Sequence, residues 1–76
     1  MKNKLLKKIK FQLWKEKIEK NYENEISIVL DETLKETFLS DSDYFLNFVK
    51  EETNSKKISF EIVRDLADRE ILFINF

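Results

Sequence analysis

The chain has 76 residues and contains no glycine and no proline. Average composition would supply about nine of these two residue types at this length. Tight hairpin turns and left-handed helix caps commonly depend on glycine, because only glycine adopts a positive φ angle without a steric cost. The composition therefore counts against a tight hairpin, and it leaves Asn21, Asn24 and Asn54 to end the helices.

Histidine and cysteine are also absent from the chain. A conventional zinc site, a thiolate nucleophile and an imidazole base near neutral pH all require one of these two residues. Asp41 and Asp43 form the closest pair of carboxylates, but they alternate with Ser40 and Ser42, which is typical of helix capping. We therefore expect a protein that is not an enzyme and that holds no cofactor or metal.

The length predicts a single domain over residues 1–76, with a core built from bulky apolar side chains that include seven phenylalanines. Lys7, Lys8 and Lys10 interrupt the N-terminal apolar stretch, which a secretory signal would keep continuous. No window has the length and apolarity of a transmembrane helix. We expect a cytoplasmic protein for which a membrane is not a natural partner.

Residues 3–22 are rich in strong helix formers and contain no helix breaker, so they predict a helix. Alternation over residues 8–13 would also fit a strand, but the flanking residues have no strand character. One side of the predicted helix carries Leu5, Leu6, Ile9 and Leu13. The opposite side carries Phe11, Trp14, Ile18 and Tyr22. A helix with two apolar sides is packed on both, bent, or exposed along one aromatic face.

The middle of the chain predicts two further helices. Apolar residues recur with a helical period from Leu30 to Val49, and the polar run at residues 40–43 interrupts them. We therefore expect helices over residues 31–39 and 42–53, although one continuous helix is also possible. Residues 25–30 alternate between polar and apolar side chains, and they are either a short strand or an extended linker.

The C-terminal segment decides the fold class. As a helix, it places Ile62, Val63 and Leu66 on one face and explains why Leu66 and Ala67 lie among charged residues. As a hairpin, it has strands over residues 58–62 and 71–76 joined by a loop over residues 65–69 that lacks glycine, asparagine and proline. The helix is favoured, so the sequence predicts an all-α bundle of three or four helices. The hairpin would instead give an α+β fold whose element order resembles that of winged-helix domains.

Charge is strongly segregated along the chain, although the formal net charge is only −1. The middle of the sequence is acidic, and a negative helical surface can dock on a basic surface of a partner. Our leading hypothesis is therefore a small inhibitor or regulator, such as a phage or mobile-element accessory protein, that binds a larger protein. The residues expected to bind this partner are Asp31, Glu32, Glu36, Asp41, Asp43, Glu51 and Glu52.

The N-terminal segment supports an alternative hypothesis, in which the chain is a nucleic-acid-binding module. Lysines interleaved with aromatic residues can contact phosphates while the aromatic rings stack on bases. The residues expected to bind nucleic acid are Lys4, Lys7, Lys8, Lys10, Lys15, Lys17 and Trp14. The absence of arginine from this segment weakens the hypothesis, because arginine is the usual residue for bidentate phosphate contacts.

The last six residues, from Ile71 to Phe76, are apolar on both faces in either conformation. Such a segment is either buried on two sides within the monomer or exposed as a patch that contacts another chain. A homodimer formed through Ile71 to Phe76 is therefore a further possibility.

Overall fold

The computed structural model describes residues 2–19 and 24–76. Within these ranges the elements follow the order α1 (Lys2–Glu19), β1 (Glu25–Leu30), α2 (Glu32–Ser40), α3 (Ser42–Thr53), β2 (Ser59–Arg64) and β3 (Glu70–Asn75). The prediction of an all-α bundle is wrong. The α+β alternative is confirmed, because the C-terminal segment is a hairpin and residues 25–30 are a strand.

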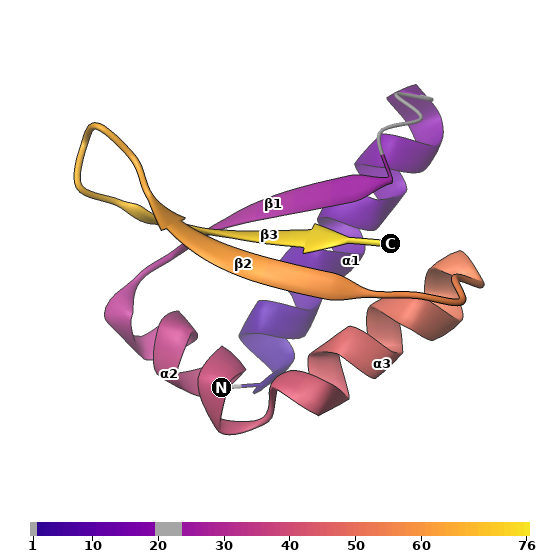
Figure 1. Ribbon diagram of the computed structural model, residues 1–76, viewed down its shortest axis with the longest axis horizontal. Coiled ribbons are helices and arrows are strands. Elements are labelled where there is room, and N and C mark those ends of the chain that lie inside the picture. The colour runs from indigo at the N-terminus through magenta and orange to yellow at the C-terminus, as the bar shows by residue number, and fades with distance from the viewer. Residues whose placement is uncertain (1, 20–23) are drawn as a thin grey trace.

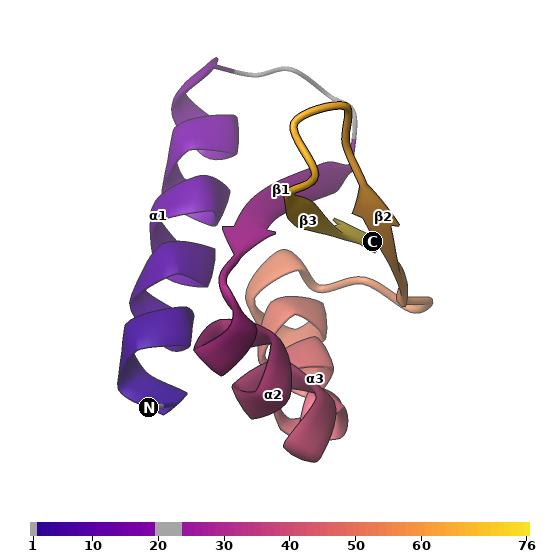
Figure 2. The same ribbon diagram turned by 90° about the vertical axis from the view of Figure 1, so that its left-hand side faces the viewer.

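The three strands form one antiparallel sheet in the order β1-β3-β2. Figure 1 shows the strands crossing the front of the molecule, with α1 behind them and α2 and α3 below. The turned view in Figure 2 separates α1 from the pair formed by α2 and α3. The strand β1 is an edge strand, and it lies next to α1.

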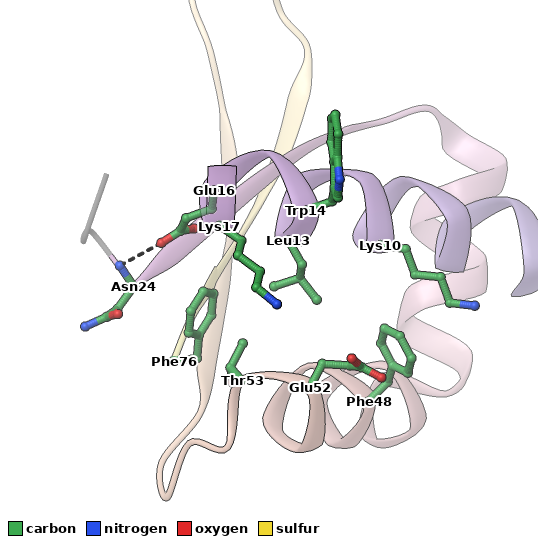
Figure 3. A pocket seen from close by; sticks show the side chains of 10 residues that line it. All are labelled: Lys10, Leu13, Trp14, Glu16, Lys17, Asn24, Phe48, Glu52, Thr53 and Phe76. Atoms are coloured by element: carbon green, nitrogen blue, oxygen red, sulfur yellow. Dashed lines mark hydrogen bonds between the residues drawn. The ribbon is translucent and has the colours of Figure 1, made fainter. Parts of the chain in front are cut away.

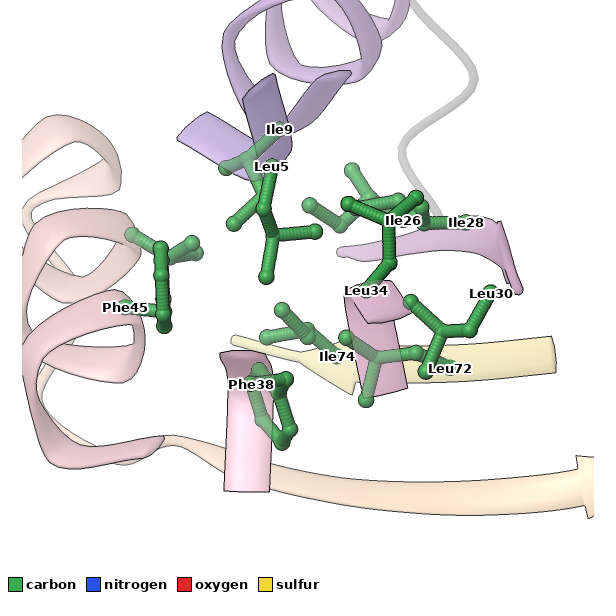
Figure 4. Close-up of a cluster of buried hydrophobic side chains, with 11 residues drawn as sticks. Leu5, Ile9, Ile26, Ile28, Leu30, Leu34, Phe38, Phe45, Leu72 and Ile74 are labelled. Carbon is green, nitrogen blue, oxygen red and sulfur yellow. The ribbon is translucent and has the colours of Figure 1, made fainter. Parts of the chain in front are cut away.

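Alternate residues of each strand face the helices. The inner rows of the sheet align Ile26 with Ile74 and Phe60, and Ile28 with Leu72 and Ile62. Of these side chains, Ile26, Ile28, Leu72 and Ile74 are buried, and they join residues of all three helices in one core (Figure 4). The buried core residues are Leu5, Ile9, Ile26, Ile28, Leu30, Leu34, Phe38, Phe45, Val49, Leu72 and Ile74.

The C-terminal strand β3 lies at the centre of the sheet, hydrogen-bonded on both sides. Leu72 and Ile74 are fully buried in the core, whereas Ile71 and Phe73 are half-buried on the outer face of the sheet. Both edges of this strand are occupied within the monomer, so a homodimer through residues 71–76 could use only that outer face.

The hairpin forms without glycine because two aspartates replace it. Asp68 adopts the left-handed conformation (φ 62°) after Leu66 and Ala67, as the third residue of a three-residue hairpin loop commonly does. The Oδ1 atom of Asp65 accepts hydrogen bonds from the N–H groups of Ala67 and Arg69. The backbone N–H of Asp65 donates to the carbonyl of Arg69 at 2.8 Å and closes the loop. The exposed Leu66 lies at the tip, which is why it occurs among charged residues.

We expect Asp65→Ala to lower the thermal midpoint of unfolding by a few degrees near neutral pH. The hydrogen bond from the backbone N–H of Arg69, followed by the hydrogen bond from its side chain, lowers the pKa of Asp65 below its ordinary value of 3.8. A carboxylate with a lowered pKa stabilises the fold above its unfolded pKa, and this contribution disappears as the pH falls through the folded value. The difference between wild type and variant, measured by circular dichroism, should therefore be constant above about pH 5 and should shrink below pH 3.8. An equal difference at all pH values would contradict the role of the carboxylate.

Asparagine and aspartate also end and begin the helices. Asn54 adopts a left-handed conformation (φ 53°) at the end of α3, as predicted. Asp31 caps α2, and its Oδ1 atom accepts the N–H of Leu34 at 2.7 Å. Asp41 occupies the capping position of α3, but its side chain pairs with Lys2 of α1 instead. Asn24 has a φ angle of 52° directly before β1, whereas the predicted cap Asn21 lies outside the described residues.

Candidate nucleic-acid interface on helix α1

Helix α1 has a buried side and an exposed apolar side, which is one of the three arrangements that its sequence allows. Leu5 and Ile9 are fully buried against the sheet and the other helices. On the opposite side Phe11, Trp14 and Ile18 are 55%, 58% and 58% exposed. Large apolar side chains grouped on a surface commonly mark a contact with a partner. The predicted fourth member of this side, Tyr22, lies outside the described residues.

Six exposed lysines surround these apolar side chains. They are Lys4, Lys7, Lys8, Lys10, Lys15 and Lys17. Lys15 approaches Glu19 at 4.0 Å, and no ion pair is found for the other five among residues 2–19 and 24–76. Exposed ammonium groups without a fixed counter-charge attract anions. We call this exposed surface of α1, formed by the six lysines with Phe11 and Trp14, the basic face.

The basic face is hollowed where α1 lies beside β1. A groove of about 600 Å³ runs between the two elements. Helix α1 contributes Lys7, Lys8, Phe11, Gln12 and Lys15 to its lining, and β1 contributes Ser27, Ile28 and Val29. Among residues 2–19 and 24–76, no acidic side chain lines this groove, so its described lining is positively charged. We call it the α1–β1 groove.

A second cleft, of about 570 Å³, lies on the other side of α1, towards α3 (Figure 3). Leu13, Phe48 and Phe76 supply its apolar lining, and the Nζ atom of Lys10 lies 5.7 Å from the centre of the Phe48 ring. Lys10 and Lys17 are balanced by Glu16 and Glu52 in this lining. This cleft therefore has no net attraction for an anion.

Most of the residues predicted to bind nucleic acid thus lie in two different hollows on either side of α1. Lys7, Lys8 and Lys15 line the α1–β1 groove, and Lys10, Lys17 and Trp14 line the second cleft. Lys4 belongs to neither lining. The rings of Trp14 and Phe11 contact each other with centroids 6.0 Å apart, so Trp14 borders the groove from outside.

The groove also contains residues that the sequence did not assign to the site. Phe11 is absent from the predicted list of binding residues, although the sequence already groups it with Trp14 among the aromatic residues interleaved with the lysines. The sequence alone could not assign three other lining residues, Gln12, Ser27 and Val29, to the site, because only the packing of β1 against α1 brings them together. Local periodicity contains no information about which strand a helix covers.

The acidic residues predicted to bind a partner have several different environments. Asp31 caps α2, Asp41 pairs with Lys2, and Glu52 lines the cleft beside α1. The other four carboxylates are exposed, and the described part of the chain offers them no ion pair: Glu32, Glu36, Asp43 and Glu51. Leu39 and Tyr44, at the junction of α2 and α3, are also exposed, by 53% and 45%.

The carboxylates with shifted pKa values belong to the hairpin. The hydrogen bond from Lys35, at 2.7 Å, lowers the pKa of Glu70, and Arg64 adds to the effect. Together with Asp65, Glu70 therefore stabilises the fold. Within residues 2–19 and 24–76, no group of three metal-ligating side chains is found that could hold an ion.

Comparison with protein-family models, with curated proteins and with solved structures finds no match to this chain. Among the described residues, no helix has the length and apolar character needed to cross a membrane.

Proposed function

We propose that this chain is a non-catalytic nucleic-acid-binding module of the cytoplasm, and that the basic face of α1 is its binding surface. The observation that supports this most is the hollowed basic face, where three lysines and a phenylalanine line one groove and no acidic residue joins them in the part of the chain that the structure describes. The sequence ranked the acidic surface first. The geometry favours the basic face, because the acidic residues include a helix cap and an ion-pair partner, whereas the lysines surround an exposed aromatic pair.

The net charge of −1 does not oppose this proposal. Exposed charges further apart than about 10 Å are largely screened at 0.1 M salt, so a polyanion responds mainly to the nearby lysines. The outward carboxylates of α3, among them Asp43 and Glu51, would repel a phosphate backbone. Binding therefore involves α1, and α3 does not enter a groove of the nucleic acid.

We expect the affinity for a fluorescently labelled oligonucleotide to fall steeply with salt, with a slope of log K against log salt of about −2 to −4 for three to six phosphate contacts. Replacing all six lysines of the basic face by glutamine should remove binding, because glutamine preserves helix propensity but carries no charge. A control variant combines Lys56→Gln with Lys57→Gln, which removes two exposed lysines that follow α3 and lie outside the basic face. Fluorescence anisotropy measures the affinity of the wild type and of both variants for the labelled oligonucleotide. Absence of binding at low salt, or equal loss in the control, would contradict the proposal.

The exposed Leu39 and Tyr44 favour a second candidate function. Apolar side chains surrounded by charges are typical of protein interfaces, so the surface of α2 and α3 could bind the basic surface of a larger protein that the chain inhibits or regulates. Carboxyl-group footprinting tests this: in host lysate Glu36, Asp43 and Glu51 should become protected relative to buffer, whereas Glu61 on β2 should not. Equal labelling in lysate and buffer would contradict this function.

A further inference from the structure

We infer that the α1–β1 groove binds single-stranded nucleic acid, with one base stacked on Phe11 and the flanking phosphates held by Lys7, Lys8 and Lys15. The inference rests on the proposed function and specifies the ligand class and the part of the basic face that contacts it. Its first support is the charge of the lining, which among the described residues includes three lysines and no acid.

The spacing along α1 supports this arrangement. A helix rises by about 1.5 Å per residue, so Lys7 and Lys8 lie roughly 11 Å along the axis from Lys15. Phe11 is exposed about midway between them. Proteins that bind single strands without sequence preference combine a positive groove along the backbone with aromatic side chains on which bases stack. The α1–β1 groove has both components in one lining.

The remaining lining residues distinguish this ligand from a lipid surface. Gln12 and Ser27 place an amide and a hydroxyl group in the groove, and β1 is an edge strand of the sheet. Such groups form hydrogen bonds with bases or sugars, whereas contact with lipid chains would desolvate them without compensation. A hollowed, polar and positive surface therefore fits a nucleic-acid strand better than a membrane.

The same geometry favours a single strand over a duplex. In a duplex the faces of the bases are stacked on one another, so a base reaches Phe11 only after it has left the stack. A single strand presents its bases without this cost.

Two triple variants test the inference. The groove variant combines K7Q, K8Q and K15Q, and the matched variant combines K4Q, K10Q and K17Q, which removes the same charge from the same helix outside the groove. The probes are a labelled oligothymidylate of about ten nucleotides and a hairpin duplex with the same number of phosphates. Circular dichroism verifies that both variants fold.

We expect the groove variant to bind the oligothymidylate about 100-fold more weakly at 0.1 M salt, since each lost phosphate contact costs roughly fivefold. The matched variant should lose about threefold or less, because its lysines act only through the screened field. Wild type should bind the single strand more tightly than the duplex.

Equal losses in the two variants, or tighter binding to the duplex, would overturn the groove assignment and leave the proposed function intact. No binding of either probe at low salt would overturn both. Binding to vesicles of anionic phospholipid, in the absence of binding to either oligonucleotide, would likewise overturn both and identify the basic face as a membrane-binding surface.

Discussion

Replacing Phe38 by alanine is expected to lower the free energy of unfolding by about 3–5 kcal/mol. Phe38 is fully buried, stacks on Phe45 with ring centroids 6.0 Å apart, and meets the edge of Phe60 at 4.9 Å. It therefore connects α2 to both α3 and β2. A chain of this length has a total stability of roughly 4–11 kcal/mol, so the variant should be largely unfolded at the lower end of that range.

Chemical denaturation followed by circular dichroism at 222 nm measures this effect. Phe11→Ala is the matched control, because it makes the same substitution at a side chain that is 55% exposed and lies outside the core. Its free energy of unfolding should stay within about 0.5 kcal/mol of wild type. A Phe38→Ala variant as stable as this control would contradict the described core.

Phe11→Ala, which should leave the free energy of unfolding almost unchanged, is expected to weaken the binding of nucleic acid. Stacking of one base on an aromatic ring contributes about 1–3 kcal/mol, so the affinity for an oligothymidylate should fall by about 5-fold to 150-fold. The loss should persist at higher salt, because stacking does not depend on counter-ion release.

Ile18→Ala is the control for this experiment. Ile18 is on the same helix and is 58% exposed, but it lies outside the lining of the α1–β1 groove and has no aromatic ring. The affinity of the Ile18→Ala variant for the oligothymidylate should stay close to that of wild type. If both variants lose affinity equally, Phe11 does not act as a stacking platform.

Most of the helical structure was predictable because apolar periodicity is a local property. Residues 42–53 form a helix as predicted, and the helix predicted over residues 31–39 is observed as Glu32–Ser40. The C-terminal hairpin was only the alternative prediction, because turns usually contain glycine, asparagine or proline and this loop has none of them. The conformation of Asp68 and the side-chain hydrogen bonds of Asp65 supply what glycine usually provides. Glu70 and Leu72, which break the helical pattern, were the signal for a strand.

The candidate site was predictable only in part. The exposed aromatic side of α1 and its lysines follow from the helical period of the sequence. The groove does not, since it depends on β1 packing beside α1 and on β3 occupying the centre of the sheet. Tertiary contacts of this kind determine which of six similar lysines line the same groove.

The most direct test of nucleic-acid binding by α1 uses the unmodified chain. Trp14 is its single tryptophan, and the indole contacts the ring of Phe11. Titration with an oligothymidylate at low salt should quench the emission of Trp14 with a saturable dependence, and added salt should restore it. Emission that stays unchanged up to about 100 µM oligonucleotide, the weak end of non-specific nucleic-acid affinities, would contradict binding at the basic face.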